Sequence, residues 1–445
     1  MDNKTTVGSD NIRSLFDAGT FVEIGAYVRS AMSEDTLDGL ICGYGSIGGK
    51  LTFAFAQDMD RMKGALDEPG AKKLRALYDM ALKNGAPVVG LFASAGAVVY
   101  DGTAALDAYG TWMRVVSDAS GIVPQIAVIC GVCAGSAAIA ASMFDVIVTV
   151  KDKTQLYMTS PFVLGEESAS AEAAAKSGLA ALVCDSQAEA LGAARALIDL
   201  LPQNNCDHPV ADPEDPNRAL AQGAVLPTAM LDGGVMMELY TEFAPEMTVA
   251  FGRMGGETVG IVHAHGDLTV DAARKASRMV SLCDAFNISV LTLIDSEGVA
   301  VDAQAQAAPA ASVYARLATA YASANCPKIT VVTGKAYGAA YTLLGSRALG
   351  ADLVFALPEA IISTMAPDKA VAFVWNDKIT EETTREMVEQ EWIDTYAKPE
   401  KAAARGDIDD IIPADQLRMR LCSALYMLAS KADGKPVRRH PTIAL

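Results

Sequence analysis

Two short segments rich in glycine and other small residues could do chemistry through their backbone. Gly131–Ala138 and Gly334–Tyr341 each follow an apolar run and precede a stretch typical of a helix. A helix begins with N–H groups that lack an intrahelical acceptor, and the positive end of its dipole lies there. Small residues let a ligand approach this backbone closely. Two such N–H groups aimed at one oxygen would form an oxyanion hole, which stabilises an enolate without a side-chain acid.

A second small-residue turn accompanies each of these segments. Ser94–Ala97 and Ser296–Val299 each end an apolar run typical of a buried strand. A single glycine turn more often serves only the tight packing of a strand against a helix. Two equivalent segments, each with a further turn at Gly96 or Gly298, favour ligand binding. The glycine spacing is not that of a dinucleotide fingerprint, so a nucleotide site is the weaker interpretation.

The elements that would position these turns occur twice along the chain. Each half has a hairpin turning on Gly-Gly, a helix pattern and a series of buried strands that end in small-residue turns. So many ordered matches predict two α/β domains related by internal duplication. The matched segments, first half and then second half, are 42–56 and 250–262, 71–84 and 271–286, 88–92 and 290–294, 123–131 and 326–334, 133–138 and 336–341, and 146–150 and 353–356.

Proline and acidic residues are concentrated between the two halves. The segment 201–216 is rich in both and predicts a linker. We therefore expect an N-terminal domain at 1–200 and a C-terminal domain at 217–445. Near the end of the second domain, the apolar spacing predicts an amphipathic helix at about 414–431.

Composition limits the possible classes of function. Hydrophobic residues make up 51% of the chain and charged residues 20%, as in a globular protein. The formal net charge of −18 argues against nucleic acid as a partner, because such a protein needs a basic face. A phosphorylated small ligand needs only a local basic group. The candidates for that role, for each of which a solvated surface charge is the better interpretation, are Lys50, Arg61, Lys63, Lys72 and Lys73.

The sequence suggests neither export nor a membrane span. Met1 leads into a polar segment without the apolar core of a secretory signal. The longest uncharged stretch, between Asp118 and Asp145, contains Pro124 and Gln125 and is interpreted as a buried α/β unit. The eight cysteines lie largely in apolar runs, as reduced core residues do. These features predict a cytoplasmic protein.

Two other groups of residues could bind a metal or react with thiols. Cys130 and Cys133 form a C-x-x-C pair, but the pair spans a strand end and the glycine turn, where core packing is the better interpretation. His263 and His265 share a strand face and lack a neighbouring cysteine or carboxylate pair. We expect both pairs to be structural, with lining of an active site as the alternative for the two histidines, and expect no metal.

Several motifs together resemble a known family. From end to end the chain is similar to the fused carboxyltransferase subunits of biotin-dependent acyl-CoA carboxylases and decarboxylases, which act on propionyl-CoA, acetyl-CoA or methylmalonyl-CoA. The segments that carry the resemblance are 131–137 (GVCAGSA), 201–205 (LPQNN), 249–256 (VAFGRMGG), 282–288 (LCDAFNI), 335–341 (KAYGAAY), 349–352 (LGAD) and 403–410 (AARGDIDD).

The resemblance implies a fold, an assembly and two binding turns. The fold would be two tandem crotonase-like domains, in a hexamer built as a dimer of trimers whose active sites combine the first domain of one subunit with the second of another. One turn would hold the thioester oxygen of the acyl-CoA as an enolate, and the other the ureido oxygen of biotin. These residues are Gly135, Ser136 and Ala137 for the acyl-CoA, and Gly338, Ala339 and Ala340 for biotin.

The implied chemistry needs no catalytic histidine or carboxylate. Carboxybiotin releases CO2, the freed biotin nitrogen takes the α-proton of a short-chain acyl-CoA, and the enolate attacks CO2. No Met-Lys-Met biotinylation sequence is present, so biotin would arrive on a separate carrier protein. A biotin carboxylase or membrane decarboxylase subunits would be further partners. The residues expected to line the substrates are Ala95, Gly96, Ala97, Gly298, Val299, Tyr337 and Thr342, the last at the position that tunes acyl-group size.

The chain departs from the family pattern at three turns. Ala95–Val98 lacks the arginine that the family usually places there, and Glu297–Val299 stands where Pro-Gly-Phe is usual. At the biotin turn, a glycine pair is replaced by Gly338 and Ala339. Backbone donors survive such side-chain changes, so we expect activity.

Other functions are open on the same residues. The chain could be the alpha subunit of a biotin-dependent acyl-CoA decarboxylase linked to an ion pump, since the same site runs in both directions. It could instead be a non-catalytic subunit that assembles a carboxylase complex. A crotonase-type hydratase or isomerase is less favoured, because neither small-residue turn is followed by suitably placed glutamates.

Overall fold

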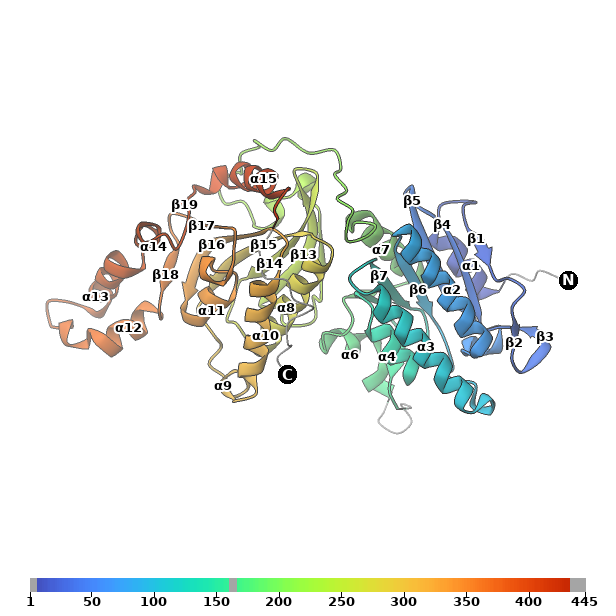
Figure 1. Ribbon diagram of the computed structural model, residues 1–445. Coiled ribbons are helices and arrows are strands. Elements are labelled where there is room, and N and C mark those ends of the chain that lie inside the picture. The colour runs from blue at the N-terminus through green and yellow to red at the C-terminus, as the bar shows by residue number, and fades with distance from the viewer. Residues whose placement is uncertain (1–5, 160–165, 433–445) are drawn as a thin grey trace. The chain divides into compact units, whose positions relative to one another are not determined.

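The computed structural model describes residues 6–159 and 166–432, which form two compact units. The first unit holds the chain as far as His208 together with Tyr240–Phe243, and the second holds Pro209–Leu239 and the chain from Ala244 onward. Each unit has its own sheet and its own hydrophobic core (Figure 1). Across the described ranges, every helix is too short or too polar to span a bilayer.

The first unit is built on a seven-stranded mixed sheet. In spatial order its strands are β1 (Val22–Ile24), β4 (Leu40–Ile47), β5 (Lys50–Gln57), β6 (Val88–Phe92), β7 (Gln125–Ile129), β9 (Val146–Val150) and β11 (Leu182–Cys184). β1, β4 and β5 are antiparallel, and the strands from β5 to β11 are parallel. Every residue of β6, β7 and β9 is buried, as expected for parallel strands covered on both faces.

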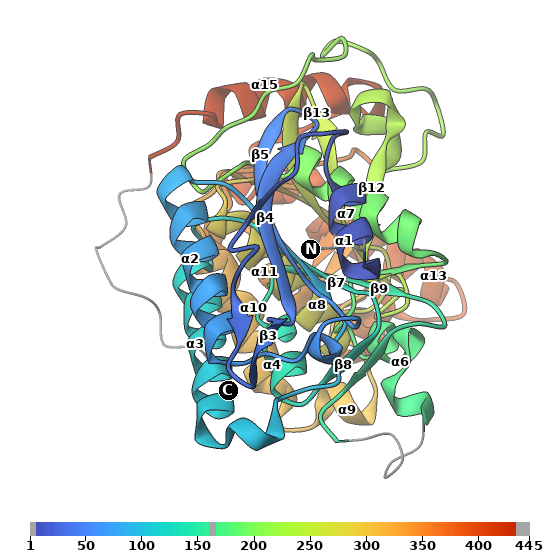
Figure 2. The ribbon, with the colours of Figure 1, turned by 90° about the vertical axis from the view of Figure 1, so that its right-hand side faces the viewer.

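Helices cover both faces of this sheet (Figure 2). The helices are α2 (Glu68–Asn84) and α3 (Thr103–Ala119) on one face, and α1 (Val7–Leu15) and α7 (Gln187–Leu200) on the other. α2 begins after Asp67, whose side chain caps the first turn, and it ends at Gly85 in the left-handed conformation. Beneath α3, the ring of Trp112 packs against Phe55 and Phe92 with centroids 5.5 and 5.4 Å apart.

Shorter elements surround the end of β7. β8 (Val132–Ala134) pairs in parallel with β10 (Gln155–Tyr157) beside the main sheet, and α4 (Ser136–Ser142) follows β8. The remaining elements of the first unit are β2 (Arg29–Ser30), β3 (Ser33–Leu37) and α6 (Ala171–Lys176).

The sheet of the second unit repeats this arrangement. Its strands are, in spatial order, β12 (Met236–Leu239), β13 (Met247–Met254), β14 (Glu257–Ala264), β15 (Ser289–Ser296), β16 (Lys328–Tyr337), β17 (Leu353–Ala356) and β19 (Asp410–Ile411). The first three are antiparallel and the rest are parallel, in the same sequence of directions as in the first sheet. β16 is continuous where β7 and β8 are separate, and its end pairs with β18 (Ile361–Ser363).

Helices of the second unit occupy matching positions. α8 (Val270–Ala285) and α10 (Ala310–Ser323) lie together, and α15 (Leu417–Leu428) packs its apolar side into the core. The amphipathic helix predicted at 414–431 is therefore shorter, because a 3-10 turn at Ala414–Gln416 precedes it. The other helices are α9 (Ala303–Gln306), α11 (Gly338–Leu343), α12 (Pro367–Val374), α13 (Arg385–Trp392) and α14 (Pro399–Arg405).

One aspartate holds the hairpin turn between β4 and β5. The Asp17 carboxylate accepts hydrogen bonds from the N–H groups of Gly48 and Gly49, at 3.2 and 3.3 Å. It also pairs with Arg195 of α7, whose Nη2 lies 2.7 Å from Asp17 Oδ1. These bonds, led by the one from Arg195, hold the pKa of Asp17 well below its usual value.

The second unit has the same arrangement of an aspartate, two glycine N–H groups and an arginine, which we call the hairpin clamp. The Asp232 carboxylate accepts hydrogen bonds from the N–H groups of Gly255 and Gly256, at 3.1 and 2.8 Å, and pairs with Arg418 of α15 at 2.6 Å. Arg418 is fully buried and also donates to the Met230 carbonyl. The repeated clamp and the repeated strand order confirm the predicted duplication of one α/β domain.

Candidate functional site

In the first unit, the predicted site residues lie at the carboxyl ends of the central strands β6 and β7. The turn Ser94–Ala97 follows β6, and the Ser94 N–H donates to the Val132 carbonyl of β8 at 2.8 Å. β8 leads directly to Gly135, at which α4 begins. The structure thus brings the two predicted groups side by side. The groups are Ala95, Gly96 and Ala97 on one side, and Gly135, Ser136 and Ala137 on the other.

The second unit brings its predicted residues together in the same way. Ser296, at the end of β15, pairs with Ala336 of β16. A Cβ atom placed on Gly298 would lie 3.7 Å from the Tyr337 carbonyl oxygen, so this turn contacts the start of α11. The residues gathered here are Gly298, Val299, Tyr337, Gly338, Ala339 and Ala340, with Thr342 exposed further along α11.

Both helix starts need glycine for conformational reasons. Gly135 and Gly338 have φ values of +57° and +54°, which other L-residues adopt at a cost. A Cβ atom on Gly338 would lie 3.2 Å from the Thr364 carbonyl oxygen, and one on Gly135 would lie 4.0 Å from that of Met158. A glycine of positive φ therefore stands at both helix starts, with less free space at the second.

Each of the helices α4 and α11 begins with N–H groups that lack an intrahelical acceptor. The Ile139 N–H donates to the Gly135 carbonyl at 3.1 Å, which starts the helical hydrogen-bond series. The N–H groups of Ser136 and Ala137 come before that bond and have no acceptor within the helix. By the matching geometry, the corresponding donors of α11 are those of Ala339 and Ala340.

In the second unit, the neighbouring turn is held by a short bridge. Leu268 and Val299 form an isolated parallel bridge, in which the Leu268 N–H donates to the Gly298 carbonyl at 2.8 Å and the Ala300 N–H donates to the Leu268 carbonyl at 3.1 Å. This bridge does not use the Val299 N–H. The equivalent bridge in the first unit joins Leu66 and Ala97.

Two serine hydroxyls that the sequence reasoning missed hold these turns. The Gly96 N–H donates to Ser94 Oγ at 3.0 Å, and the Gly298 N–H donates to Ser296 Oγ at 3.4 Å. The hydroxyl fixes the local turn and occupies the glycine N–H, which leaves the next N–H as the candidate donor. A serine two residues before each glycine was a sequence signal that could have revealed this.

An ion pair at the second turn was also missed. The Nζ of Lys335 lies 2.6 Å from Oε1 of Glu297, and the Lys335 N–H donates to Asp295 Oδ1 at 2.8 Å. The hydrogen bond to Glu297 raises the pKa of Lys335. At the matching positions, the first turn has Ala95 and Val132.

Most of the basic residues proposed for CoA phosphates have partners within their own unit. Lys63 lies against the first turn, where its carbonyl accepts the Ala95 N–H at 2.9 Å, and its side chain is exposed. It is the member of the set best placed to meet a ligand. The contacts of the others are Lys50 with the Ile198, Asp199 and Leu201 carbonyls, Arg61 with Asp58, Lys72 with Glu68, and Lys73 with Asp38 and the Leu40 carbonyl.

The cysteine and histidine pairs have structural surroundings. Burial raises the pKa of the Cys130 and Cys133 thiols to about 12, so neither forms a reactive thiolate at neutral pH. The rings of His263 and His265 lie 5.1 Å apart, and burial lowers the pKa of His263 to about 4. Over the described residues, no three His, Cys, Asp or Glu side chains are grouped to hold a metal.

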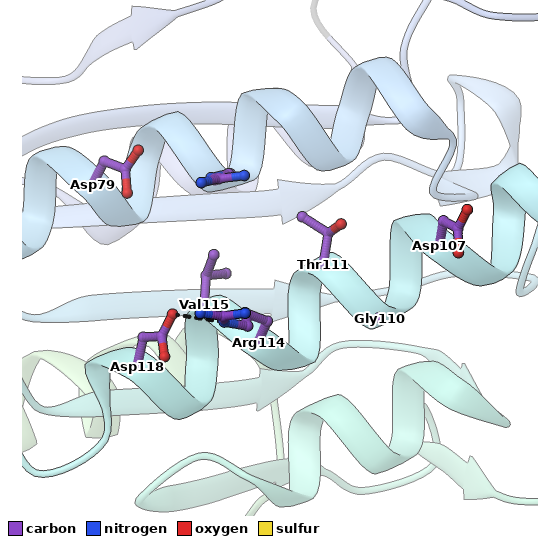
Figure 3. A pocket seen from close by; sticks show the side chains of 8 residues that line it. Asp79, Asp107, Gly110, Thr111, Arg114, Val115 and Asp118 are labelled. Atoms are coloured by element: carbon purple, nitrogen blue, oxygen red, sulfur yellow. Dashed lines mark hydrogen bonds and ion pairs between the residues drawn. The ribbon is translucent and has the colours of Figure 1, made fainter.

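A charged cavity of about 480 Å³ lies between α2 and α3 (Figure 3). Figure 3 shows that its walls carry acidic and basic side chains from both helices. None of the predicted site residues lines it, so it is separate from the glycine turns. Its lining residues are Arg75, Asp79, Asp107, Gly110, Thr111, Arg114, Val115 and Asp118.

Comparison with known proteins gives a match along nearly the whole chain. Residues 3–443 match the family model described as the carboxyl transferase domain. A carboxyltransferase subunit of propionyl-CoA carboxylase from Haloferax mediterranei is 34% identical, with 100% of this chain and 94% of the relative covered. The methylmalonyl-CoA decarboxylase subunit alpha of Propionigenium modestum is 33% identical, with 98% and 92% covered.

Solved structures agree with the sequence match. The crystal structure of transcarboxylase 12S with hydrolysed methylmalonyl-CoA bound superposes with a TM-score of 0.94 at 29% identity, over 98% of this chain and 92% of that one. A second 12S structure, with methylmalonyl-CoA and methylmalonic acid bound, gives 0.93 at 30% identity, over 98% and 92%. The prediction of two tandem crotonase-like domains is confirmed.

Proposed function

This chain belongs to the carboxyl transferase domain family, and on that premise we propose that it moves CO2 between carboxybiotin on a separate carrier protein and a short-chain acyl-CoA. The family makes it a carboxyltransferase of the biotin-dependent acyl-CoA carboxylase type. The acyl group, the direction in the cell and the roles of single residues are part of the proposal.

The observation that carries the proposal is the pair of equivalent helix starts. Each unit presents backbone N–H groups after a glycine of positive φ, at Gly135 and at Gly338. Carboxyl transfer needs two such places, because two different carbonyl oxygens gain negative charge during the reaction. A hydratase or isomerase needs only one group of backbone donors for a carbonyl oxygen, together with a carboxylate above the acyl chain.

The site of the first unit, formed by the turn Ser94–Ala97 and the start of α4, is proposed to hold the thioester oxygen. When the α-proton leaves, negative charge moves to that oxygen, and the N–H groups of Ser136 and Ala137 would stabilise the resulting enolate together with the Ala97 N–H. These donors are fixed before the substrate binds, so little reorganisation opposes the reaction. The small side chains of the turn leave the backbone accessible.

The second turn is proposed to hold the ureido oxygen of biotin. Its donors would be the N–H groups of Ala339, Ala340 and Val299, which suit a neutral carbonyl acceptor. When bound, biotin supplies the ureido nitrogen that carries the carboxyl group and afterwards accepts the α-proton. The chain's own task at this turn is to orient the ureido group and to stabilise charge on its oxygen.

The relatives guide the choice of substrate and assembly. The names of the curated relatives include propionyl-CoA carboxylase and methylmalonyl-CoA decarboxylase, and the 12S structures are described as a hexamer with methylmalonyl-CoA bound. We therefore propose propionyl- or methylmalonyl-CoA ahead of acetyl- or malonyl-CoA, and a hexamer with a biotin carrier and a biotin carboxylase as partners. Eight free cysteines suit the cytoplasm.

Decarboxylation is the second candidate function. The relative from Propionigenium modestum is a methylmalonyl-CoA decarboxylase subunit and is about as similar as the carboxylase subunits. In that role the same turns would run the transfer from acyl-CoA to biotin, with membrane decarboxylase subunits as partners.

The test is a transfer assay on the purified protein. Free biotin is mixed separately with malonyl-, methylmalonyl- and glutaconyl-CoA, and the product acyl-CoA is followed by chromatography. We expect biotin-dependent loss of the carboxyl group from methylmalonyl-CoA. If no substrate reacts, while the wild type and a Ser136→Pro variant bind CoA equally well, the catalytic proposal is wrong and a scaffold role takes its place.

A further inference from the structure

A pair of opposite charges stands at the second glycine turn. Lys335 Nζ lies 2.6 Å from Glu297 Oε1. Glu297 immediately precedes Gly298, and Lys335 lies three residues before Gly338 on β16, the strand that leads into α11. The pair therefore borders both segments from which the second turn is built.

The backbone around Lys335 is fixed more firmly than its side chain. Its N–H donates to Asp295 Oδ1 at 2.8 Å. Lys335 and Tyr337 are two residues apart on β16 and so point to the same side of the strand. The Tyr337 carbonyl oxygen would lie 3.7 Å from a Cβ atom placed on Gly298. The ammonium group thus starts from an anchored position beside the turn.

The ion pair itself can be exchanged. The side chains of Lys335 and Glu297 are 47% and 57% exposed, and an ion pair with this exposure contributes little net stability. A second carboxylate could replace Glu297 at low cost. The raised pKa of Lys335 keeps the amine protonated at neutral pH. The second turn therefore carries a permanent cation whose partner is replaceable.

The ion pair of Lys335 and Glu297 lies at the turn for which the proposed function requires an N-carboxylated ureido ligand. A ureido oxygen bound at the start of α11 is three bonds from the carboxylate carbon on the neighbouring nitrogen. The first turn, proposed for the thioester oxygen of the acyl-CoA, has Ala95 and Val132 in place of Glu297 and Lys335. We propose that Lys335 binds the carboxylate of the N-carboxylated ureido ligand, and that Glu297 is the resting partner that this carboxylate replaces. This inference rests on the proposed function.

Lys335 is expected to affect binding of the carboxylated ligand and not the chemical step. When the N–C bond breaks, its electron pair stays with the ureido group and the carboxylate leaves as neutral CO2. An ammonium ion attracts a carboxylate more strongly than it attracts CO2, so it favours arrival of the carboxylated ligand. Once CO2 has formed, Lys335 returns to Glu297. The pair thereby distinguishes the carboxylated from the uncarboxylated ligand.

The first test measures binding without turnover. Biocytin and carboxybiocytin are titrated into the full-length protein by calorimetry at alkaline pH, where N-carboxylated ureas decompose slowly, in the absence of acyl-CoA. We expect the wild type to prefer carboxybiocytin by about tenfold, as for one charge-assisted hydrogen bond. Lys335→Gln should bind both ligands alike, Lys335→Arg should keep the preference, and Glu297→Gln should increase it.

The second test measures transfer from carboxybiocytin to propionyl-CoA. In Lys335→Gln we expect KM for carboxybiocytin to rise about tenfold, with KM for propionyl-CoA and kcat within about twofold. The matched control is Lys398→Gln, which breaks another exposed pair, with Asp394 at 2.9 Å, and should change neither KM.

The outcomes separate this inference from the proposed function. If an active wild type and Lys335→Gln show the same preference for carboxybiocytin, the assignment of Lys335 is wrong. Equal weakening of both ligands would also overturn it, because that result indicates a structural effect. A wild type that transfers no carboxyl group to or from any acyl-CoA would contradict the proposed function, and the inference would fall with it.

Discussion

The two units share a fold and a turn geometry, but their turns differ in charge. The glycines at the helix starts, Gly135 and Gly338, have nearly the same φ. At the matching positions beside them, the first turn has Ala95 and Val132 and the second has the Glu297–Lys335 pair. After the duplication the backbone conformation was kept and the neighbouring side chains changed. The difference indicates one shared device, a set of backbone donors, adapted in the proposed function to a thioester oxygen in one unit and to a carboxylated ureido group in the other.

The hairpin clamps show a second difference between the units. Arg195 is 34% exposed in its pair with Asp17, whereas Arg418 is fully buried in its pair with Asp232. The bonding pattern is the same, but the environment of the arginine is not. The same substitution should therefore have unequal effects in the two units.

Removal of one backbone donor from each turn should have the largest effect. Proline is tolerated at the start of a helix, where it removes an N–H that has no intrahelical acceptor. We expect Ser136→Pro and Ala339→Pro each to lower kcat for carboxyl transfer by about 10²–10³-fold, the usual cost of an oxyanion-hole donor. The measurement is the biotin-dependent transfer assay, with circular dichroism to confirm the fold.

Arg385→Pro is the matched control for these variants. Arg385 is the first residue of α13, after the capping residue Thr384, and α12 and α14 already begin with proline. Its replacement should leave kcat unchanged. If one of the two turn variants keeps full activity, the turns are not equivalent and the comparison between them is wrong.

Loss of the clamp arginines should destabilise the units unequally. Arg418→Ala would leave Asp232 and several carbonyls without a buried partner, so we expect unfolding free energy to fall by about 3–5 kcal/mol. For the partly exposed Arg195→Ala we expect a loss of about 1 kcal/mol. Urea unfolding of both variants tests this, and equal losses would contradict the assigned difference in burial.

Acid should weaken the second unit through His263. Burial lowers its pKa to about 4 from 6.5, so between these values the unfolded chain binds a proton that the folded chain does not. Stability should therefore fall as the pH drops from 6.5 to 4, by about 1–3 kcal/mol. The matching position of the first unit is Ala56, which cannot titrate.

Urea unfolding at pH 7 and pH 5 measures this dependence. His263→Asn should reduce the difference between the two pH values. His265→Asn should keep most of it, because burial rather than the neighbouring ring is the main cause of the shift. An unchanged pH dependence in His263→Asn would show that other groups are responsible.

Cys133→Ala should have the smallest effect. It makes the first turn resemble the second, which has Ala336 at the same position. Because burial raises the pKa of the Cys133 thiol to about 12, we expect kcat to stay within about twofold of the wild type. A large loss of transfer activity would indicate a chemical role for the C-x-x-C pair.

The sequence predicted the features that depend on local backbone shape. Glycine at positions 135 and 338 indicates a backbone with positive φ, and apolar runs indicate buried strands such as β6. The duplication was visible because these signals recur in the same order. These are the parts of the fold and the candidate site that one stretch of chain determines by itself.

The remaining features depend on contacts between distant residues. Glu297 and Lys335 are 38 residues apart, and Asp17 and Arg195 are 178 apart, so neither pair can be recognised before the strand order is known. The predicted helix at 414–431 was too long, because apolar spacing does not mark where a 3-10 turn replaces the α-helix.

The use of main-chain donors at both turns has a consequence for tolerance to mutation. In a saturation scan selected for activity, Gly135 and Gly338 should accept almost no replacement, because their positive φ excludes other residues. Ser136 and Ala339, one position further on, should accept most small and medium side chains and reject proline. A profile of this kind would be invisible to methods that look for indispensable side chains, so enzymes built this way can diverge widely in sequence while keeping their chemistry.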